Sequence, residues 1–205
     1  NTKKFILDYS KKFQENWNCL NILTRNASSV GAKDLNIINS NNQRNLVLKK
    51  LNKHEIDLLF LFGQDDLKFK KNKEYIIYIG SHGDNGAEIA DIILPSPAYT
   101  EQNGYFTNLE GIIQKAFKAS SPTGSAKEEW QIINELTEIL TSKKLFDNKS
   151  SLLDSMFNFL KNKRKPTNKE NSEAVFYTEK ISILDIDYYF TNVIARASKT
   201  MNDCR

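Results

Sequence analysis

The residues best suited to chemistry lie in the run Gly80-Ser-His-Gly-Asp-Asn-Gly86, directly after an apolar stretch. Glycines let backbone amides approach an anion, and a helix starting just beyond them adds its dipole. The spacing is neither G-x-G-x-x-G nor G-x-x-x-x-G-K-[ST]. A phosphate loop is therefore one interpretation, and a tight turn from strand to helix is the other. The spacing favours the turn.

Several titratable side chains in and after this run could take part in catalysis. His82 could transfer protons, although a histidine beside glycine in a turn more often caps or hydrogen-bonds the backbone. Asp84 and Glu88 lie one helical turn apart, which suits either paired carboxylates or a helix-start charge beside a solvated face. Glu101 and Glu110 raise the same question, and Glu110-Gly111 is more typical of a turn whose carboxylate holds the backbone.

Motifs that would give these residues a reaction are missing from the sequence. There is no G-x-S-x-G, no H-E-x-x-H, and no cysteine with a plausible histidine neighbour. Two cysteines, Cys19 and Cys204, cannot hold an iron–sulfur cluster or a four-ligand zinc site alone, and we expect them to be reduced thiols. We therefore predict no catalytic, no cofactor-binding and no metal-binding residue in this chain.

Composition excludes two broad classes of partner. The net charge of +4 comes mostly from lysines spread among acidic residues, which predicts a solvated surface rather than a nucleic-acid footprint. No apolar run approaches the ~20 residues that span a bilayer, so we expect no direct membrane span. No secretory signal is visible, and the chain starts at Asn1.

Three short apolar runs, each closed by Gly or Pro, must position the candidate residues. They are Leu58–Phe62, Tyr75–Ile79 and Ile92–Leu94. Their length and endings predict strands buried on both faces of a mainly parallel, doubly wound α/β sheet. The loops Thr24–Val30, Gly63–Asp66 and Gly80–Gly86 would then lie at the carboxyl edge, where such sheets bind ligands.

Further elements are predicted in the rest of the chain, and the helices among them follow from the helical spacing of apolar residues. A strand is expected over Trp17–Leu23 and a loop over Asn36–Asn45. Helices are expected over 3–15, over Val30–Leu35, over 126–141 with a capping box formed by Ser125 and Glu128, and after a cap at Ser150 or Ser151. The face formed by Leu152, Leu153, Met156, Phe157 and Leu160 predicts a core helix.

A charged stretch divides the chain into three parts. We predict an α/β domain over 1–160, a charged linker over 161–173, and an extended C-terminal segment over 174–205 that docks on the domain or on a partner.

Blocks of sequence along nearly the whole chain resemble one family. They include Ser81-His-Gly-Asp-x-Gly-Ala, Ile89-Ala-Asp-Ile-Ile-Leu-Pro, Phe106-x-Asn-x-Glu-Gly-x-x-Gln and Thr191-Asn-x-Ile-x-Arg-Ala-Ser-x-Thr-Met. The pattern resembles the large domain of molybdopterin oxidoreductases. The last block is similar to the C-terminus of its cofactor-free version in the 75 kDa subunit of respiratory complex I. Two departures are Ile112, where the family usually has arginine, and the absence of a cysteine-rich, ferredoxin-like N-terminal portion.

The resemblance implies a non-catalytic scaffold in the peripheral arm that carries electrons from NADH to ubiquinone. It places that arm on the matrix side of the mitochondrial inner membrane, or on the cytoplasmic face in bacteria. It implies no cofactor on this chain, with FMN and iron–sulfur clusters on partner subunits. The chain would match the last third of the usual subunit, as a split-gene product or fragment. We expect obligate association with the chain that carries the N-terminal iron–sulfur part, because half a domain exposes sheet edges and apolar surface.

Two alternatives stay open at this point. In a genuine molybdopterin-dependent oxidoreductase, Gly80–Gly86 and Gly104–Gln114 would contact the pterin or a guanine phosphate. The scarcity of arginine in both loops argues against it, since phosphate and guanine recognition favours arginine. An independent nucleotide-binding module is the other alternative, and the expected phosphate-loop spacing is missing.

Overall fold

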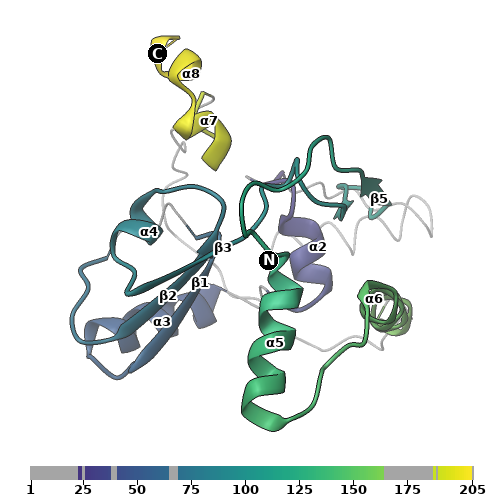
Figure 1. Cartoon of the computed structure of the whole chain (residues 1–205). Helices are drawn as coiled ribbons and strands as arrows, with labels where there is room; N and C mark the ends of the chain where they lie inside the picture. The colour runs from purple at the N-terminus through teal and green to yellow at the C-terminus, as the bar shows by residue number, and fades with distance from the viewer. Residues whose placement is uncertain are drawn as a thin grey trace, which may run out of the picture.

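A computed structural model describes residues 23–24, 26–37, 41–64, 69–163, 187 and 189–204 (Figure 1). The predicted helix over 3–15 and nearly all of the predicted strand Trp17–Leu23 lie outside these residues. So does the predicted linker from residue 164 onward.

Three parallel strands form the larger sheet, in the order β1-β2-β3. They are β1 (Leu58–Phe62), β2 (Tyr75–Gly80) and β3 (Ile92–Pro95). Cα partners run from Leu58 opposite Tyr75 to Phe62 opposite Ile79, and β3 continues the parallel pairing along the other side of β2. The three predicted strands and the parallel α/β sheet are confirmed.

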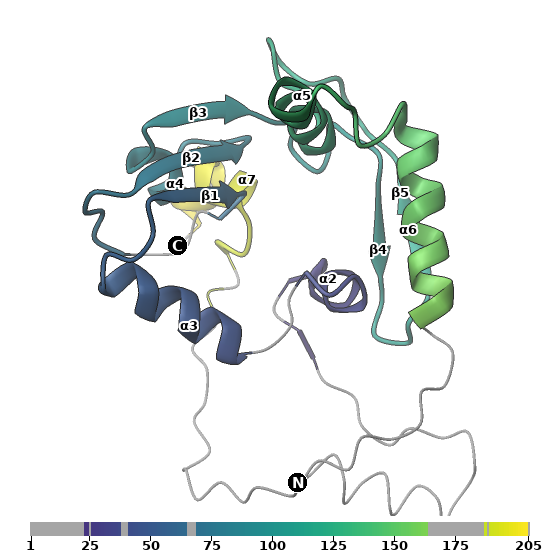
Figure 2. The same ribbon diagram turned by 90° about the horizontal axis from the view of Figure 1, so that it is seen from below.

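One face of this sheet carries the core. Leu61, Ile76 and Tyr78 are buried there. The partly buried side chains that pack against them are Leu59, Phe69, Ala87, Ile89 and Ala90. The short helix α4 (Asn85–Glu88) lies on this face, where its Ala87 packs against the cluster. Figure 2 shows α3 (Asn41–Asn52) below β1, past that edge of the sheet. The predicted burial on both faces is wrong for β1 and β3, because both are edge strands of the sheet that the described residues form. Phe62 is 48% exposed and Ile92 is 38% exposed.

The predicted loop Asn36–Asn45 is wrong at its end, because α3 begins at Asn41. A run of asparagines favours loops, but tertiary contact overrides this weak preference once Leu51 is buried at 4% exposure. The helix stops where His54 takes a positive φ of 59°.

A two-stranded antiparallel hairpin lies apart from the sheet. Its strands are β4 (Gly104–Thr107) and β5 (Ile113–Ala116). The short helix α2 (Ser29–Asp34) confirms the helix predicted over Val30–Leu35 and packs on β4, with Gly31 against Thr107. Thr24–Val30 therefore leads to the hairpin, and its predicted place at the carboxyl edge of the sheet is not confirmed.

Two longer helices follow, α5 (Glu129–Thr141) and α6 (Lys149–Lys163). The predicted caps are corrected. Glu128 and Gln131 form the capping box of α5, and the Asn148 side chain accepts from the Ser151 amide at 3.0 Å at the start of α6. The apolar face of α6 packs on the hairpin, where the Phe157 and Tyr105 rings meet edge to face at 5.2 Å.

Asn134 fixes the turn between these two helices and was not singled out by the sequence reasoning. Its side chain is buried on α5, where it donates to the Phe146 carbonyl at 2.9 Å and accepts from the Leu145 and Phe146 amides. Because all three hydrogen bonds go to backbone groups of the turn, the buried Asn134 amide is satisfied and fixes the turn's conformation.

The C-terminal segment forms two short helices, α7 (Val193–Ala197) and α8 (Lys199–Asp203), which lie beyond α4 in Figure 1. Asn192 and Ser198 cap them through their side chains. Cys204 is a free, exposed thiol. Among the described helices, none has both the length and the apolar character that a bilayer crossing requires.

Candidate functional site

The run Gly80–Gly86 connects β2 to α4 and wraps around Tyr78. The Tyr78 ring is 1% exposed, and its hydroxyl donates to the His82 carbonyl at 3.1 Å. A Cβ at Gly80 would overlap this ring and its hydroxyl, and a Cβ at Gly86 would lie 2.6 Å from the Gln64 carbonyl oxygen. These two glycines are therefore needed for packing within the chain, and Gly83 is the one that faces open space.

Asp84 occupies the place where an anion would bind. It is the N-cap of α4, and its Oδ1 accepts from the Asn85 amide at 2.8 Å. Its Oδ2 lies 2.6 Å from Nε of Arg196, on the C-terminal helix α7. Because an anion at this helix start would compete with a carboxylate already bound and neutralised, the loop is closed by its own residues.

Two of the candidate acid–base residues are not brought together with Asp84 by any described contact. His82 is half-buried, and its Nδ1 lies 2.9 Å from Oγ of Ser81. Glu88 is exposed on the outer side of α4. The interpretation of Asp84 and Glu88 as helix-start charge and solvated face fits these positions, since the described partner of Asp84 is an arginine.

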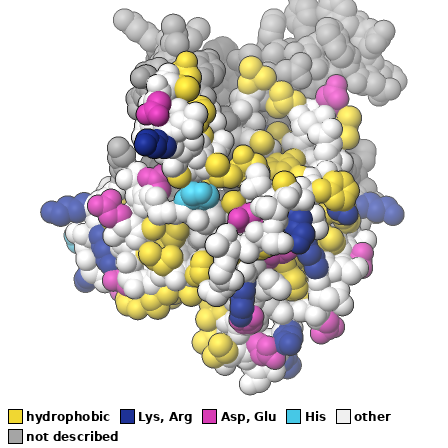
Figure 3. All heavy atoms as spheres, turned by 45° about the horizontal axis from the view of Figure 1, so that its top comes forward, with side chains coloured by type: hydrophobic (Ala, Val, Ile, Leu, Met, Phe, Trp, Pro, Cys, Tyr) yellow, Lys and Arg dark blue, Asp and Glu magenta, His cyan; other side chains and the backbone are white. Residues whose placement is uncertain are grey.

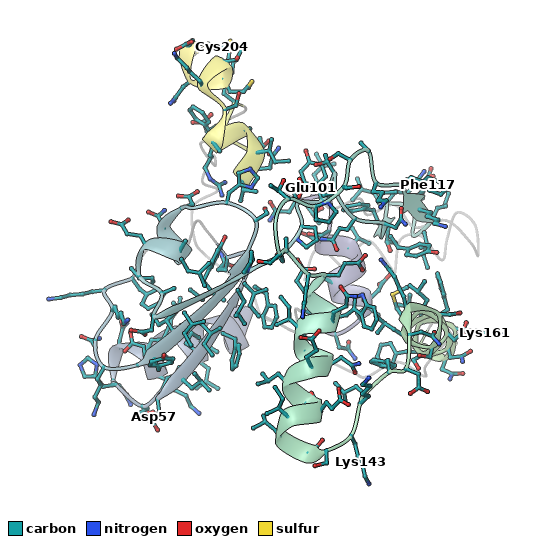
Figure 4. All side chains as sticks on the ribbon, in the orientation of Figure 1. Asp57, Glu101, Phe117, Lys143, Lys161 and Cys204 are labelled. Atoms are coloured by element: carbon teal, nitrogen blue, oxygen red, sulfur yellow. The ribbon has the colours of Figure 1, made fainter. Side chains whose placement is uncertain are left out.

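The second pair of candidate carboxylates is also separated. Glu101 holds the backbone through its Oε2, which accepts from the Ala98 amide at 2.9 Å. Figure 4 shows Glu101 on the connection between the sheet and the hairpin. Glu110 is exposed at the hairpin turn, and the backbone there is held by Asn108, whose Oδ1 accepts from the Ile112 amide at 2.9 Å. The pinning role predicted for Glu110 therefore belongs to Asn108.

Asp91 is a structural carboxylate that the sequence reasoning did not single out. One oxygen accepts from the Ile76 amide at 2.8 Å, and the other lies 2.5 Å from Nζ of Lys71. The Lys71 hydrogen bond and the Ile76 amide lower the pKa of Asp91 below its ordinary value. The residue ties the start of β3 to the start of β2. The signal available in the sequence was an acidic residue directly before an apolar strand.

In both candidate loops, described groups contact other residues of this chain. The glycine-rich loop is packed against Tyr78 and Gln64, and its amide at the start of α4 is used by Asp84. The hairpin segment presents lysine rather than arginine, with Lys115 lying over the Phe117 ring at 4.7 Å. Within the described ranges, no three histidine, cysteine, aspartate or glutamate side chains are grouped so that they could hold a metal ion.

Among the described residues, the parallel sheet defines an α/β domain whose glycine-rich loop is closed by Asp84 and Arg196. The chain belongs to the molybdopterin oxidoreductase family, whose model matches residues 4–139. Residues 158–204 match the model for the C-terminal region of the G subunit of NADH-ubiquinone oxidoreductase.

Individual relatives share the same two regions. The chain is 35% identical to the NADH-ubiquinone oxidoreductase 75 kDa subunit of Reclinomonas americana, over 98% of this chain and 30% of that protein. It is 40% identical to the G subunit of the NADH-quinone oxidoreductase of Rickettsia bellii, over 97% of this chain and 29% of the relative. It is 31% identical to the mitochondrial 78 kDa subunit of Candida albicans, over 98% and 30%. The chain thus spans about 30% of the length of the curated relatives it matches.

Proposed function

We propose that this chain is a non-catalytic structural part of the G or 75 kDa subunit of an NADH-quinone oxidoreductase. The observation that carries the proposal is the closed loop after β2. Tyr78 fills it, Asp84 caps the helix that would bind an anion, and Arg196 neutralises Asp84. The whole chain is similar to subunits of such oxidoreductases. This similarity supports a structural role in a large assembly for a domain that carries no catalytic residues.

In this role the domain scaffolds the peripheral arm that carries electrons from NADH to quinone. FMN and iron–sulfur clusters would lie on other parts of the assembly, and the main neighbour would be the iron–sulfur-bearing remainder of the subunit. Mitochondrial and bacterial relatives both support this proposal. We place the arm on the matrix side of the inner membrane in a mitochondrion and on the cytoplasmic face in a bacterium.

Native electrophoresis of membranes from the source organism tests the proposal, with the chain located by mass spectrometry. We expect the chain to migrate with NADH dehydrogenase activity in a very large complex. Migration as a small separate species would overturn the proposal. A molybdenum and pterin assay on that species would then decide whether a cofactor-dependent oxidoreductase takes its place.

Two substitutions test the non-catalytic part of the proposal. His82→Gln and Glu88→Gln remove the two candidate acid–base groups that are not part of the Asp84–Arg196 ion pair. In the assembled complex we expect NADH-to-quinone turnover per complex to stay within about twofold of the unsubstituted protein, since Glu88 is exposed and His82 is only half-buried. A loss of tenfold or more, with the amount of complex unchanged, would show a chemical role for this loop.

A further inference from the structure

An open apolar groove lies between the second face of the large sheet and α5. We call it the α5 groove. Its floor is formed by alternate side chains of the three strands, namely Phe60, Phe62, Ile77, Ile79, Ile92 and Leu94. Its wall is formed by four apolar side chains of α5, Ile133 and Leu136 among them. The groove has a volume of about 740 Å³.

Several side chains of the lining are exposed, so the described residues leave the groove open, although Ile79 on the central strand is 1% exposed. Phe62 is 48% exposed, Ile133 is 38% and Leu136 is 37%. Figure 3, a space-filling view of one face of the molecule, shows hydrophobic side chains open on the surface between charged ones. The charged residues at the rim are Lys127 and Glu135, whose Nζ and Oε2 atoms pair at 2.8 Å. The floor consists of apolar side chains and carries no charge.

The topology of the sheet shows where a cover must come from. Strands in the order β1-β2-β3, all parallel, have right-handed connections that place their crossovers on one and the same face. The crossover helix α4 lies on the core face with Tyr78, and the groove is on the other. The connections within this sheet therefore cannot cover the groove, and α5 reaches only one side of it.

We propose that the α5 groove receives an amphipathic α-helix from the part of the subunit that lies outside these 205 residues. Parallel sheets are covered by helices on both faces, and in doubly wound sheets the second face is covered by the other half of the fold. About 70% of each relative's length lies beyond the region that this chain matches, since the match covers 30% of it. This inference rests on the proposed function, and it assigns the docking surface for that function.

Thiol labelling at two leucines of one helix tests the inference. Leu136 lines the groove, and Leu140 lies one turn further along α5, 73% exposed and outside the groove lining. Leu136→Cys and Leu140→Cys are each introduced into the chain, and labelling is read from the peptide that holds the new cysteine. We expect Leu136→Cys to react at least tenfold more slowly in the assembled complex than in the isolated chain, and Leu140→Cys to change by less than twofold.

A photo-crosslinking amino acid at position 136 then identifies the occupant. A cross-link to a helix of the iron–sulfur-bearing remainder of the subunit is the expected result. A cross-link to another subunit or to a second copy of this chain would overturn the inference. So would slow labelling of Leu136→Cys in the isolated chain, because a segment of this chain would then fill the groove.

The two proposals can fail separately. If the native chain migrates with the complex but Leu136→Cys stays as reactive there as in isolation, the docking surface is wrong and the proposed function stands. If the native chain does not enter the complex, both are wrong. As a second measurement, Leu136→Lys should reduce incorporation into the complex at least tenfold, whereas Leu140→Lys should incorporate normally.

Discussion

The Tyr78 side chain fixes the conformation of the glycine-rich loop. Its ring occupies the space inside the loop that a ligand would need. The hydroxyl is satisfied by the His82 carbonyl, and the ring lies close to Gly80 and Gly86. Glycine in such a run can serve either a close approach to a ligand or a close approach within the chain. At these two positions the neighbour is the protein itself, so the glycines are expected to affect stability rather than binding.

Gly86→Ala should destabilise the protein, although alanine favours helices by about 1 kcal/mol over glycine. The new Cβ would lie 2.6 Å from the Gln64 carbonyl oxygen and 2.9 Å from the Tyr78 ring, and neither can move away cheaply. Overpacking costs about 1–3 kcal/mol, and subtracting the helix gain leaves an expected net loss of up to about 2 kcal/mol in the free energy of unfolding. Urea denaturation measures it.

Gly83→Ala is the matched control for that change, because nothing lies within 4 Å of a Cβ at Gly83. We expect it to alter the free energy of unfolding by less than about 0.5 kcal/mol. Equal effects of the two alanines would contradict the packing role assigned to Gly86.

Asp91→Asn should make stability depend less on pH. The pKa of Asp91 is lowered in the folded protein, chiefly by its hydrogen bond to Lys71. Its ionised form therefore contributes stability that is fully present above the unfolded carboxyl pKa of about 3.9 and is lost as the pH falls through the lower folded value. The native protein should exceed the variant in stability at pH 7, and the difference should shrink below about pH 5.

Urea midpoints at pH 7, 5 and 3 measure this dependence, with Asp154→Asn as the control. Asp154 is an exposed residue on α6. Its replacement should leave the midpoint nearly unchanged at each pH. A stability difference for Asp91→Asn that stayed the same down to pH 3 would show that the ionised form of Asp91 is not what stabilises the fold.

At the scale of elements, the strands were predictable because each is a short apolar run closed by Gly or Pro. The same rule failed on burial, because nothing in Leu58–Phe62 indicates that β1 would be an edge strand within the described sheet. The start of α3 was predicted as a loop because asparagines favour loops. The helix forms there because the buried Leu51 side chain anchors it. A single sequence indicates the secondary-structure propensity of each segment. It does not indicate which other element packs against that segment and buries it.

The candidate site was predictable in position but not in its contacts. The interpretation of Gly80–Gly86 as a turn from strand to helix followed from spacing alone and is supported by the packing of Tyr78. The ion pair that closes the loop was not predictable. It joins Asp84 to Arg196 across 112 positions of sequence, and no local pattern encodes so distant a contact.

The Asp84–Arg196 ion pair connects α7 to the start of α4, and its two side chains are 24% and 28% exposed. We expect it to stabilise the docking of α7 and α8. Asp84→Asn keeps an oxygen that can cap α4 but removes the charge that holds Arg196. Arg196→Gln removes the other partner. Each change should lower the free energy of local opening of α7 and α8 by about 1 kcal/mol. This corresponds to a roughly fivefold faster amide hydrogen exchange in the two helices.

Hydrogen exchange read by mass spectrometry checks this at the level of peptides. Lys199→Gln is the control, because it removes a positive charge from an exposed position on α8. It should leave the exchange of both helices unchanged, and β2 should be protected equally in all the variants. Normal exchange in α7 with either partner of the ion pair removed would mean that other contacts hold the C-terminal segment.

At the scale of the whole molecule, the chain carries more apolar surface than a self-sufficient domain needs. The sheet has three strands, and β1 and β3 have no second neighbour among the described residues. Ile139, which lines the α5 groove, is 80% exposed, and Phe62 on the floor of the groove is 48% exposed. Surfaces of this kind mark places where a partner binds.

The isolated chain should therefore associate with itself when its natural partner is missing. A net charge of +4 on 205 residues gives only weak repulsion between copies, so apolar contact between sheet edges and α5 should prevail at micromolar concentrations. Sedimentation velocity over a range of concentrations should show species larger than the monomer. The double change Leu136→Glu with Ile139→Glu should reduce them at least severalfold, because it places two like charges in the groove where copies would meet. A single monomeric species that unfolds cooperatively, with or without these changes, would mean that the 205 residues complete a domain by themselves and that the scaffold proposal lacks its physical basis.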